Sequence, residues 1–381
     1  MHSTIHEQIL KTSDVIVVKV GTNVLSRDNG LLNEPRIVQL CRDLHIARQQ
    51  KRRIVLVTSG AVGAGMGQLG LEKRPSEIAY LQAVAAIGQG KLIETYSQIL
   101  RLYGVNCAQI LLTANDLSNR ESYLNTRNTI LTLLGLGILP IINENDTVSV
   151  ARLNTTFGDN DRLAALVANL FQRPLLVLLT DVDGLFDKDP RLPDAKLIPV
   201  IENWSSDLMQ MVVDTSSLKH GRSKGGMASK LKAAKMITAS GGTVIIANGD
   251  REETLGQVLS GQETGTIFLT KQYLTARKRW LGFAVKTEGK MVLDDGAIKA
   301  IADKGKSLLP VGVLSAEGEF ERGSVVSLVN VQNWEVGQGL TNYSLQDVQR
   351  IMGKKTSELQ EIIGKNVYME VIHRDNMQIF H

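Results

Sequence analysis

Two lysines in this sequence lie beside stretches of chain that would expose backbone amides. Lys19 lies at the end of the apolar run 15-VIVVKV-20 and precedes a Gly-Thr pair. Lys230 closes the stretch 225-GGMASK-230, in which two glycines come just before a predicted helix. A cation beside open amides, or near the positive end of a helix dipole, is suited to binding phosphate. Lys19 could equally be a strand-end lysine whose amine reaches solvent.

A run of small residues, 58-TSGAVGAG-65, follows the apolar segment Ile54–Val57. Small side chains let a ligand approach main-chain N–H groups where a strand turns into a helix. The run matches neither the G-x-G-x-x-G dinucleotide motif nor the P-loop motif, and the latter is absent from the whole sequence, so a P-loop NTPase is not expected. Close packing of a helix by small residues is the alternative explanation.

Two further loops are rich in amide and carboxylate side chains. The stretch 142-INEND-146 follows an apolar segment, and 158-GDND-161 begins a predicted helix. Such side chains can hold the ammonium group and the polar head of an amino acid. Asp159 or Asn160 could equally serve as the N-cap of that helix.

The loop 180-TDVDGL-185 continues with Asp187 and Asp189. It resembles a calcium loop only loosely, because the D-x-D-x-D-G spacing fails and no glutamate stands at the twelfth position. We favour a loop that covers a nucleotide. We predict no protein metal site.

Alternating strands and helices are expected to position these loops. The predicted strands are short and mostly apolar, as is typical of strands covered on both faces: Val15–Val20, Ile54–Thr58, Ala108–Leu112, Ile138–Ile142, Leu175–Thr180, Thr243–Ala247 and Thr266–Leu269. The predicted helices are Pro35–Gln50, Glu77–Leu102, Glu121–Leu134, Asn160–Phe171 and Met227–Ser240. This alternation predicts an α/β fold, an αβα sandwich with a mostly parallel sheet, whose ligands lie beyond the carboxyl ends of the strands.

The character of the sequence changes after Tyr273–Trp280. Shorter, alternating runs punctuated by glycine predict strands at Pro310–Leu314, Ser324–Val329 and Glu335–Leu340, with helices at Asp295–Lys304 and Ser344–Met352. We therefore expect two domains, residues 1–271 and a small β-rich barrel over residues 277–381.

Charge and composition argue against nucleic acid or membrane as the main partner. The 381 residues carry 43 Lys+Arg against 39 Asp+Glu, and residues 277–381 are almost neutral. Aromatic residues make up only 4%, too few for a base-stacking surface. No secretory signal and no apolar run of 18 residues is present, so we expect a cytoplasmic protein. Cys41 and Cys107 are expected to be reduced thiols.

Taken together, these motifs resemble the amino acid kinase family, and within it the branch that phosphorylates the γ-carboxylate of L-glutamate with ATP at the start of proline biosynthesis. The stretches that carry the resemblance are Val18–Thr22, Val57–Gly65, Arg120–Arg127, Ile142–Thr147, Gly158–Asp161, Thr180–Gly184 and Gly225–Lys230. The C-terminal part is similar to a PUA domain through Arg277–Trp280, Ser307–Pro310, Arg322-Gly323 and His373–Asp375.

The resemblance implies roles for individual residues. Lys19 and Lys230 would flank the transferring phosphoryl group, and Asp161 would position those lysines. The glutamate-binding residues would be Ser59, Asp146 and Asn160, with Asn143 nearby. The nucleotide would contact Lys19, Thr180, Asp181 and the run Lys224, Gly225, Gly226, Met227, Ala228, Ser229 and Lys230. The family usually has Gly-Thr before the Gly-Gly-Met, whereas this sequence has Ser223-Lys224.

The resemblance also implies Mg²⁺ accompanying ATP, feedback inhibition by proline, and a homo-oligomer. RNA binding by the PUA-like part is expected to be absent or weak. N-acetylglutamate, aspartate and carbamate are the alternative substrates within the family, and the Arg120–Arg127 stretch and the PUA-like part favour glutamate.

Overall fold

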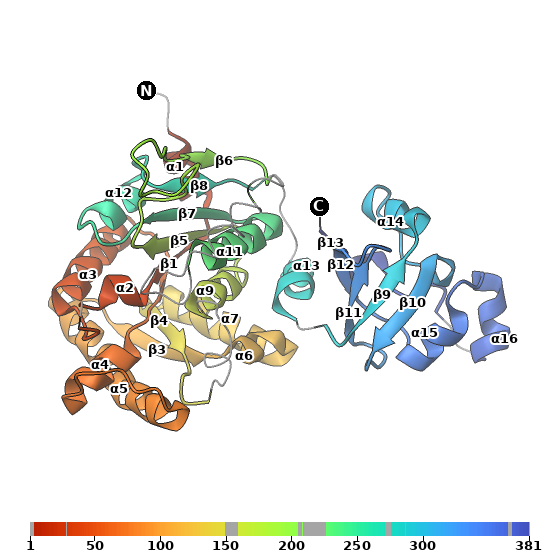
Figure 1. The fold of residues 1–381 in the computed structure, drawn as a ribbon, viewed down its shortest axis with the longest axis horizontal. Helices are drawn as coiled ribbons and strands as arrows, with labels where there is room; N and C mark the ends of the chain where they lie inside the picture. The colour runs from red at the N-terminus through yellow and green to blue at the C-terminus, as the bar shows by residue number, and fades with distance from the viewer. Residues whose placement is uncertain are drawn as a thin grey trace. The chain divides into compact units, whose positions relative to one another are not determined.

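The computed structural model describes residues 4–27, 29–148, 159–204, 208, 226–270, 276–285, 287–364 and 368–380, and it forms two compact units, Met1–Tyr273 and Leu274–His381 (Figure 1). None of the helices in these ranges has the length and hydrophobicity of a transmembrane span.

The first unit is built on one sheet of eight strands, in the order β3-β4-β2-β1-β5-β7-β8-β6. The strands are β1 (Val15–Val20), β2 (Ile54–Val57), β3 (Cys107–Leu112), β4 (Leu139–Glu144), β5 (Pro174–Thr180), β6 (Val200–Ile201), β7 (Thr243–Asn248) and β8 (Thr266–Phe268). The pairings from β3 through to β7 are parallel, and β8 pairs antiparallel with β7. β1 and β5 are buried at every position, as expected for strands covered on both faces.

Helices cover both faces of this sheet (Figure 1). The helices are α1 (Ile5–Thr12), α2 (Thr22–Leu25), α3 (Glu34–Gln49), α4 (Ala61–Leu69), α5 (Ile78–Leu102), α6 (Ala114–Ser118), α7 (Arg120–Gly135), α9 (Asp159–Ala168), α11 (Met227–Ser240) and α12 (Thr254–Ser260). One apolar core joins α1, α3, α5 and α12 to side chains of β1, β2 and β5. On the opposite face α9 packs on β1 and β5, and α11 packs on β5 and β7. The predicted αβα sandwich is confirmed.

The boundaries of the elements differ from the prediction in places. β6 was not predicted, because a two-residue strand leaves no periodic pattern. The helix predicted over Asn160–Phe171 ends at Ala168, and its last predicted residues continue as turns in which Phe171 N–H donates to Ala168.

The second unit contains a five-stranded sheet, in the order β10-β9-β11-β12-β13. Its elements are α13 (Ala276–Arg279), β9 (Gly289–Leu293), α14 (Asp295–Ala302), β10 (Val313–Gly318), β11 (Val325–Val329), β12 (Glu335–Leu340), α15 (Leu345–Ile351), α16 (Leu359–Ile363) and β13 (Met377–Ile379), with a π-helical turn at Trp280–Ala284 and 3-10 turns at Pro310–Gly312, Thr356–Glu358 and Arg374–Asn376. The β-rich character of this unit is confirmed. The strand predicted over Pro310–Leu314 is wrong in its first half, because Gly312 N–H turns back to the Leu309 carbonyl and the ladder starts at Val313.

Helices α4 and α5 touch through their backbones. A Cβ atom added to Gly88 of α5 would lie 1.8 Å from the carbonyl oxygen of Ala61, and one added to Gly65 of α4 would lie 2.0 Å from the carbonyl oxygen of Val84. Such distances are far inside van der Waals contact, so only glycine fits at either position. The glycine at 65 therefore serves helix packing, which was the alternative explanation for the run of small residues.

This contact predicts opposite effects for two glycine substitutions in one helix. Gly88→Ala should lower the free energy of unfolding by about 1–3 kcal/mol, because the new methyl group forces α4 away. Gly90→Ala is the matched control, since nothing lies within 4 Å of the added atom, and it should raise the free energy of unfolding by up to about 1 kcal/mol through helix propensity. Urea titrations of both variants measure these values. Equal stability of Gly88→Ala and the wild type would contradict the packing argument.

Candidate active site

The strand register brings the sequence motifs together at one edge of the sheet. In β1, Lys19 is paired with Val57 of β2 on one side and with Leu178 of β5 on the other. The polar residues that follow those two strands therefore flank Lys19. Val57 is also paired with Ile142 of β4, which places the loop after β4 next to the loop after β2. This is the edge at which parallel sheets bind ligands.

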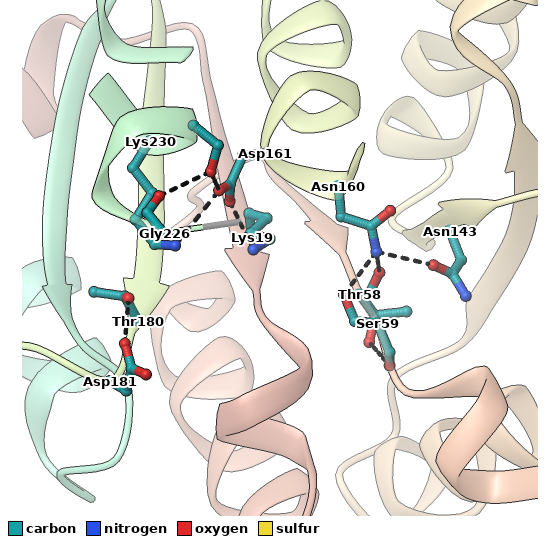
Figure 2. A network of polar contacts seen from close by, with 11 residues as sticks. Lys19, Thr58, Ser59, Asn143, Asn160, Asp161, Thr180, Asp181, Gly226 and Lys230 are labelled. Atoms are coloured by element: carbon teal, nitrogen blue, oxygen red, sulfur yellow. Dashed lines mark hydrogen bonds and ion pairs between the residues drawn. The ribbon is translucent and has the colours of Figure 1, made fainter. Parts of the chain in front are cut away.

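Asp161 joins three of these elements through buried charge (Figure 2). Its carboxylate lies 2.7 Å from Lys19 Nζ of β1 and 3.4 Å from Lys230 Nζ of α11. Ser229 donates a further hydrogen bond of 2.6 Å to the same carboxylate. The side chain of Asp161 is 1% exposed, and those of the two lysines are below a tenth exposed.

Two ammonium groups share one carboxylate in this buried group, and Lys230 also lies near enough to Asp181 to help lower the pKa of that second carboxyl. Burial by itself would raise the pKa of Asp161, but the two lysines outweigh that effect and lower the pKa below its usual range. Asp161 is thus ionised at neutral pH and holds both amines beside the site.

Asn160, the residue before Asp161, organises a second group that contains no charge. Its Nδ2 donates to the Thr58 carbonyl at 2.8 Å, lies 2.6 Å from Ser59 Oγ, and lies 3.3 Å from Asn143 Oδ1. Asn143 in turn donates from Nδ2 to Gln89 Oε1 at 2.7 Å. Asn160 Oδ1 is buried and has no hydrogen-bond partner in the part of the chain that is described. An unsatisfied buried acceptor is costly, and a ligand that donates a hydrogen bond would relieve that cost.

A third polar group follows β5. Thr180 Oγ1 donates to Asp181 Oδ1 at 3.0 Å, and Asn23 Nδ2 of α2 donates to Asp181 Oδ2 at 2.9 Å. Burial raises the pKa of Asp181, but these hydrogen bonds and the nearby charge of Lys230 outweigh it and lower the pKa below its usual range. The backbone of Gly249, at the end of β7, donates to the Thr180 carbonyl at 2.6 Å, so the ends of β5 and β7 are tied together here.

Gly226 and the first turn of α11 form the side of the site next to Lys230. Gly226 caps α11 without a side chain, and its carbonyl accepts a 3.0 Å hydrogen bond from Ser229. Gly226, Met227 and Ala228 are accessible, whereas Ser229 and Lys230 are buried. A helix start with accessible amides and a lysine beside it is suited to an anion.

Some predicted site residues are not part of these groups. Asp146 lies in the loop after β4 and lines a small cavity together with Gln89 and Thr147, and no hydrogen bond from Asp146 to Asn160 is found among the described residues. Gly158, Ser223, Lys224 and Gly225 lie outside the described residues. Of the small residues after β2, Ser59 reaches the site. Gly60 begins the turn into α4 with a φ of 103°, a conformation that favours glycine.

Gln89 and Tyr96 of α5 were not predicted as part of the site. Tyr96 is buried, and its hydroxyl lies 2.9 Å from Thr58 Oγ1. The two residues are seven positions apart, which places them on one face of the helix. Polar side chains on the buried face of a predicted amphipathic helix are the signal by which they could have been found. Asn23 was missed as well, because it lies in a helix of only four residues.

The described residues contain no group of three or more His, Cys, Asp or Glu that could hold a metal ion. Asp161, the most buried carboxylate of the site, has its two oxygens directed to two lysines. A divalent cation at this site would therefore need most of its ligands from a bound anion and water.

Comparisons with known proteins assign both units. The family model described as the amino acid kinase family matches residues 14–248, and the PUA domain model matches residues 289–363. A relative from Thermoanaerobacter pseudethanolicus, named glutamate 5-kinase, is 46% identical over 366 residues, which cover 96% of this chain and 97% of the relative. A relative of the same name from Methylococcus capsulatus is 44% identical over 95% of this chain and 96% of the relative. Another from Rhodopirellula baltica is 42% identical over 98% of this chain and 95% of the relative.

The buried charges predict a large loss of stability when Asp161 is neutralised. Asp161→Asn removes the carboxylate that two buried lysines share, and we expect the free energy of unfolding to fall by about 3–5 kcal/mol. Asp14→Asn is the control, since the ion pair of Asp14 with Arg173 is 3.3 Å long and partly exposed, and it should cost about 0–1 kcal/mol.

The difference in free energy of unfolding between the wild type and Asp161→Asn is predicted to depend on pH. The pKa of Asp161 is lowered in the folded protein. The ionised carboxyl therefore makes its full contribution to the free energy of unfolding above the pKa of an unfolded aspartate, about 3.9. That contribution is lost as the pH falls through the lowered folded pKa. Urea titrations should therefore give a constant difference between wild type and Asp161→Asn from pH 8 to about pH 5, and a shrinking difference in stronger acid. A difference that grows on acidification would contradict this assignment.

Proposed function

The chain belongs to the amino acid kinase family and, within it, to the glutamate 5-kinases, and from this premise we propose how its own residues transfer the γ-phosphoryl group of ATP to the γ-carboxylate of L-glutamate. The reaction is the first step of proline biosynthesis. The observation that carries the proposed mechanism is the buried Lys19–Asp161–Lys230 group, in which one carboxylate holds two amines. The product is an acyl phosphate, γ-glutamyl phosphate.

The chemistry requires charge compensation more than proton transfer. The side-chain carboxyl of glutamate has a pKa of about 4.3, so it is already a nucleophile at pH 7 and needs no general base. Its attack brings an anion towards the triphosphate, and two unit charges 4 Å apart repel by about 4 kcal/mol at an effective dielectric constant of 20. Lys19 and Lys230 are placed to offset this repulsion, and Asp161 holds their amines in position before the substrates arrive.

The uncharged group around Asn160, together with Asp146 of the loop after β4, is the proposed binding site for the acceptor amino acid. Ser59, Asn143, Asp146 and Asn160 offer a hydroxyl, two amides and a carboxylate, which suit the ammonium and α-carboxylate of glutamate. Because Asn160 and Asp161 are consecutive, the residue that orients the acceptor and the residue that orients the lysines move together. This arrangement would hold the attacking carboxylate near the phosphoryl group, which lowers the entropic part of the barrier.

The proposed nucleotide site lies between the end of β5 and the start of α11. Thr180 and Asp181 line one side, and Gly226 to Lys230 line the other, with Lys224 and Gly225 preceding them in sequence. The nucleotide would enter as its magnesium complex, with the phosphate oxygens and water supplying most of the ligands of Mg²⁺.

We further propose that proline inhibits the enzyme by competing at the glutamate pocket, that the enzyme is a cytoplasmic homo-oligomer, and that RNA is not its main ligand. These proposals rest on the family resemblance and on the small net charge of residues 277–381.

The proposed mechanism predicts that removal of either lysine lowers kcat strongly while the protein still folds. Lys19→Met and Lys230→Met each leave Asp161 with one counter-charge, and each should lower kcat by about 10²–10³. Lys235→Met is the control, because Lys235 is an exposed residue of α11, and kcat should stay within about twofold of the wild type. Near-wild-type turnover of either active-site variant would refute the assigned roles.

The identity of the acceptor is tested by a coupled assay of ADP release with ATP, Mg²⁺ and a panel of acceptors. We expect turnover with L-glutamate, none with N-acetylglutamate, and an apparent KM for glutamate that rises when proline is added. Turnover with N-acetylglutamate and none with glutamate would refute the proposed substrate. Inhibition by proline with an unchanged KM would refute the overlap of the two pockets.

A further inference from the structure

Gln89 is one of two described residues that α5 contributes to the polar network, the other being Tyr96. Gln89 lies in the middle of α5, more than fifty positions before Asn143 and seventy before Asn160 in the sequence. Its Oε1 accepts the 2.7 Å hydrogen bond from Asn143 Nδ2, and Asn143 itself is 2% exposed. A hydrogen bond this short to a buried amide is positioned to control which way that amide faces.

The directions of the amides follow from their partners, starting at the Thr58 carbonyl. A backbone carbonyl can only accept, so the atom of Asn160 that faces it at 2.8 Å is the donor Nδ2. The atom of Asn143 at 3.3 Å from that Nδ2 must then be its acceptor, Oδ1. Asn143 therefore directs its own donor, Nδ2, at Gln89.

Without an acceptor at position 89, this order is no longer fixed. Asn143 Nδ2 would be a buried donor with no partner, and a rotation of the amide by 180° would bring its Nδ2 against Asn160 Nδ2. Two donors facing each other repel, which would weaken the orientation of Asn160 that the Thr58 carbonyl sets and in which its Oδ1 stays open to a ligand. The acceptor on α5 thus fixes the direction of the Asn143 amide and supports that of Asn160.

The helix contact fixes where that acceptor lies. Gly88, the neighbour of Gln89, touches the first turn of α4 through its backbone, and α4 begins directly after Ser59 and Gly60. Tyr96, on the same face of α5, holds Thr58 through the 2.9 Å contact between their hydroxyls. Helix α5 therefore supports both ends of the amide chain, through Gln89 at Asn143 and through Tyr96 at Thr58.

From these contacts we propose that Gln89 is a positioning residue for the acceptor amino acid: its Oε1 orients Asn143, and through Asn143 it supports the orientation of Asn160 for binding glutamate. This inference rests on the proposed function of the site. It assigns to Gln89 no direct contact with the substrate and no role at the nucleotide.

The test is a steady-state comparison of three variants of the full chain. Gln89→Met keeps the length of the side chain and removes the acceptor, and we expect kcat/KM for glutamate to fall about tenfold or more, with the KM for ATP within about twofold of the wild type. Gln89→Glu keeps an acceptor at the same reach and should recover most of the loss. Gln98→Met is the matched control, because Gln98 is an exposed residue of the same helix whose amide contacts only Glu94 among the described residues, and it should leave both parameters unchanged.

Three outcomes would overturn the inference. They are an unchanged kcat/KM for glutamate in Gln89→Met, equal losses for glutamate and ATP, and an equal loss in Gln89→Met and Gln89→Glu. If Gln89→Met does not fold, Gln89→Ala removes the acceptor without adding bulk and is judged by the same split between the two substrates. A wild-type enzyme inactive with glutamate would refute the proposed function instead, and the assay of the wild type separates the two cases.

Discussion

A buried carboxylate between two lysines is the interaction on which the rest of this site depends. Burying three charges is unfavourable, and the arrangement persists because each lysine lies within ion-pair distance of Asp161. The three residues come from β1, α9 and α11, so the ion pairs also tie together the middle of the sheet and the two helices that cover one face. Two amines that one carboxylate holds in place before a ligand arrives are the form of preorganisation that the proposed phosphoryl transfer requires.

The position of α9 explains how the proposed site could bind both an amino acid and the phosphates of a nucleotide. Consecutive residues of a helix point about 100° apart, so Asn160 and Asp161 in its first turn face different directions. Asn160 faces the neutral amides and hydroxyls after β2 and β4, which select by hydrogen-bond geometry (Figure 2). Asp161 faces the two lysines, which act by charge. In the proposed mechanism, the boundary between the acceptor site and the phosphate site therefore falls between these two adjacent residues, where the reacting atoms would meet.

Much of this organisation is predictable from sequence because it follows from local patterns. Apolar runs of four to seven residues predict the buried strands, and polar residues just beyond them predict the edge where ligands bind. Lys19 and Thr180 near the ends of such runs, and Asn143 just beyond one, lie at this edge of the sheet in the structure. Residues such as Gln89 and Tyr96 were not predicted, because their contribution depends on how close α5 comes to the sheet and to α4. That distance is set by Gly65 of α4 and Gly88 of α5, each of which packs against the backbone of the other helix. The spacing of residues within one helix does not predict such a contact. The prediction that a strand begins at Pro310 was wrong for a related reason. A turn hydrogen bond forms there in place of the hydrogen bonds of the strand ladder.

The backbone contact at Gly88 and the hydrogen-bonded amides of Gln89, Asn143 and Asn160 depend on each other. Where a Cβ is absent at Gly88, α5 approaches the start of α4 to within backbone contact, and only at that distance do Gln89 and Tyr96 reach the loops after β4 and β2. The glycine contact therefore sets the distance between α5 and the sheet, and at that distance the hydrogen bonds of Gln89 and Tyr96 orient the polar groups of the site.

Hydrogen bonds weaken steeply with distance and angle, so a small displacement of α5 would change the proposed acceptor site more than it changes the core. The charged group around Asp161 differs in this respect, because Coulomb attraction falls slowly with distance. Acceptor recognition is accordingly the part of the site that depends most on the packing of α5, whereas the lysines keep their charge and most of their attraction for phosphate when that packing loosens.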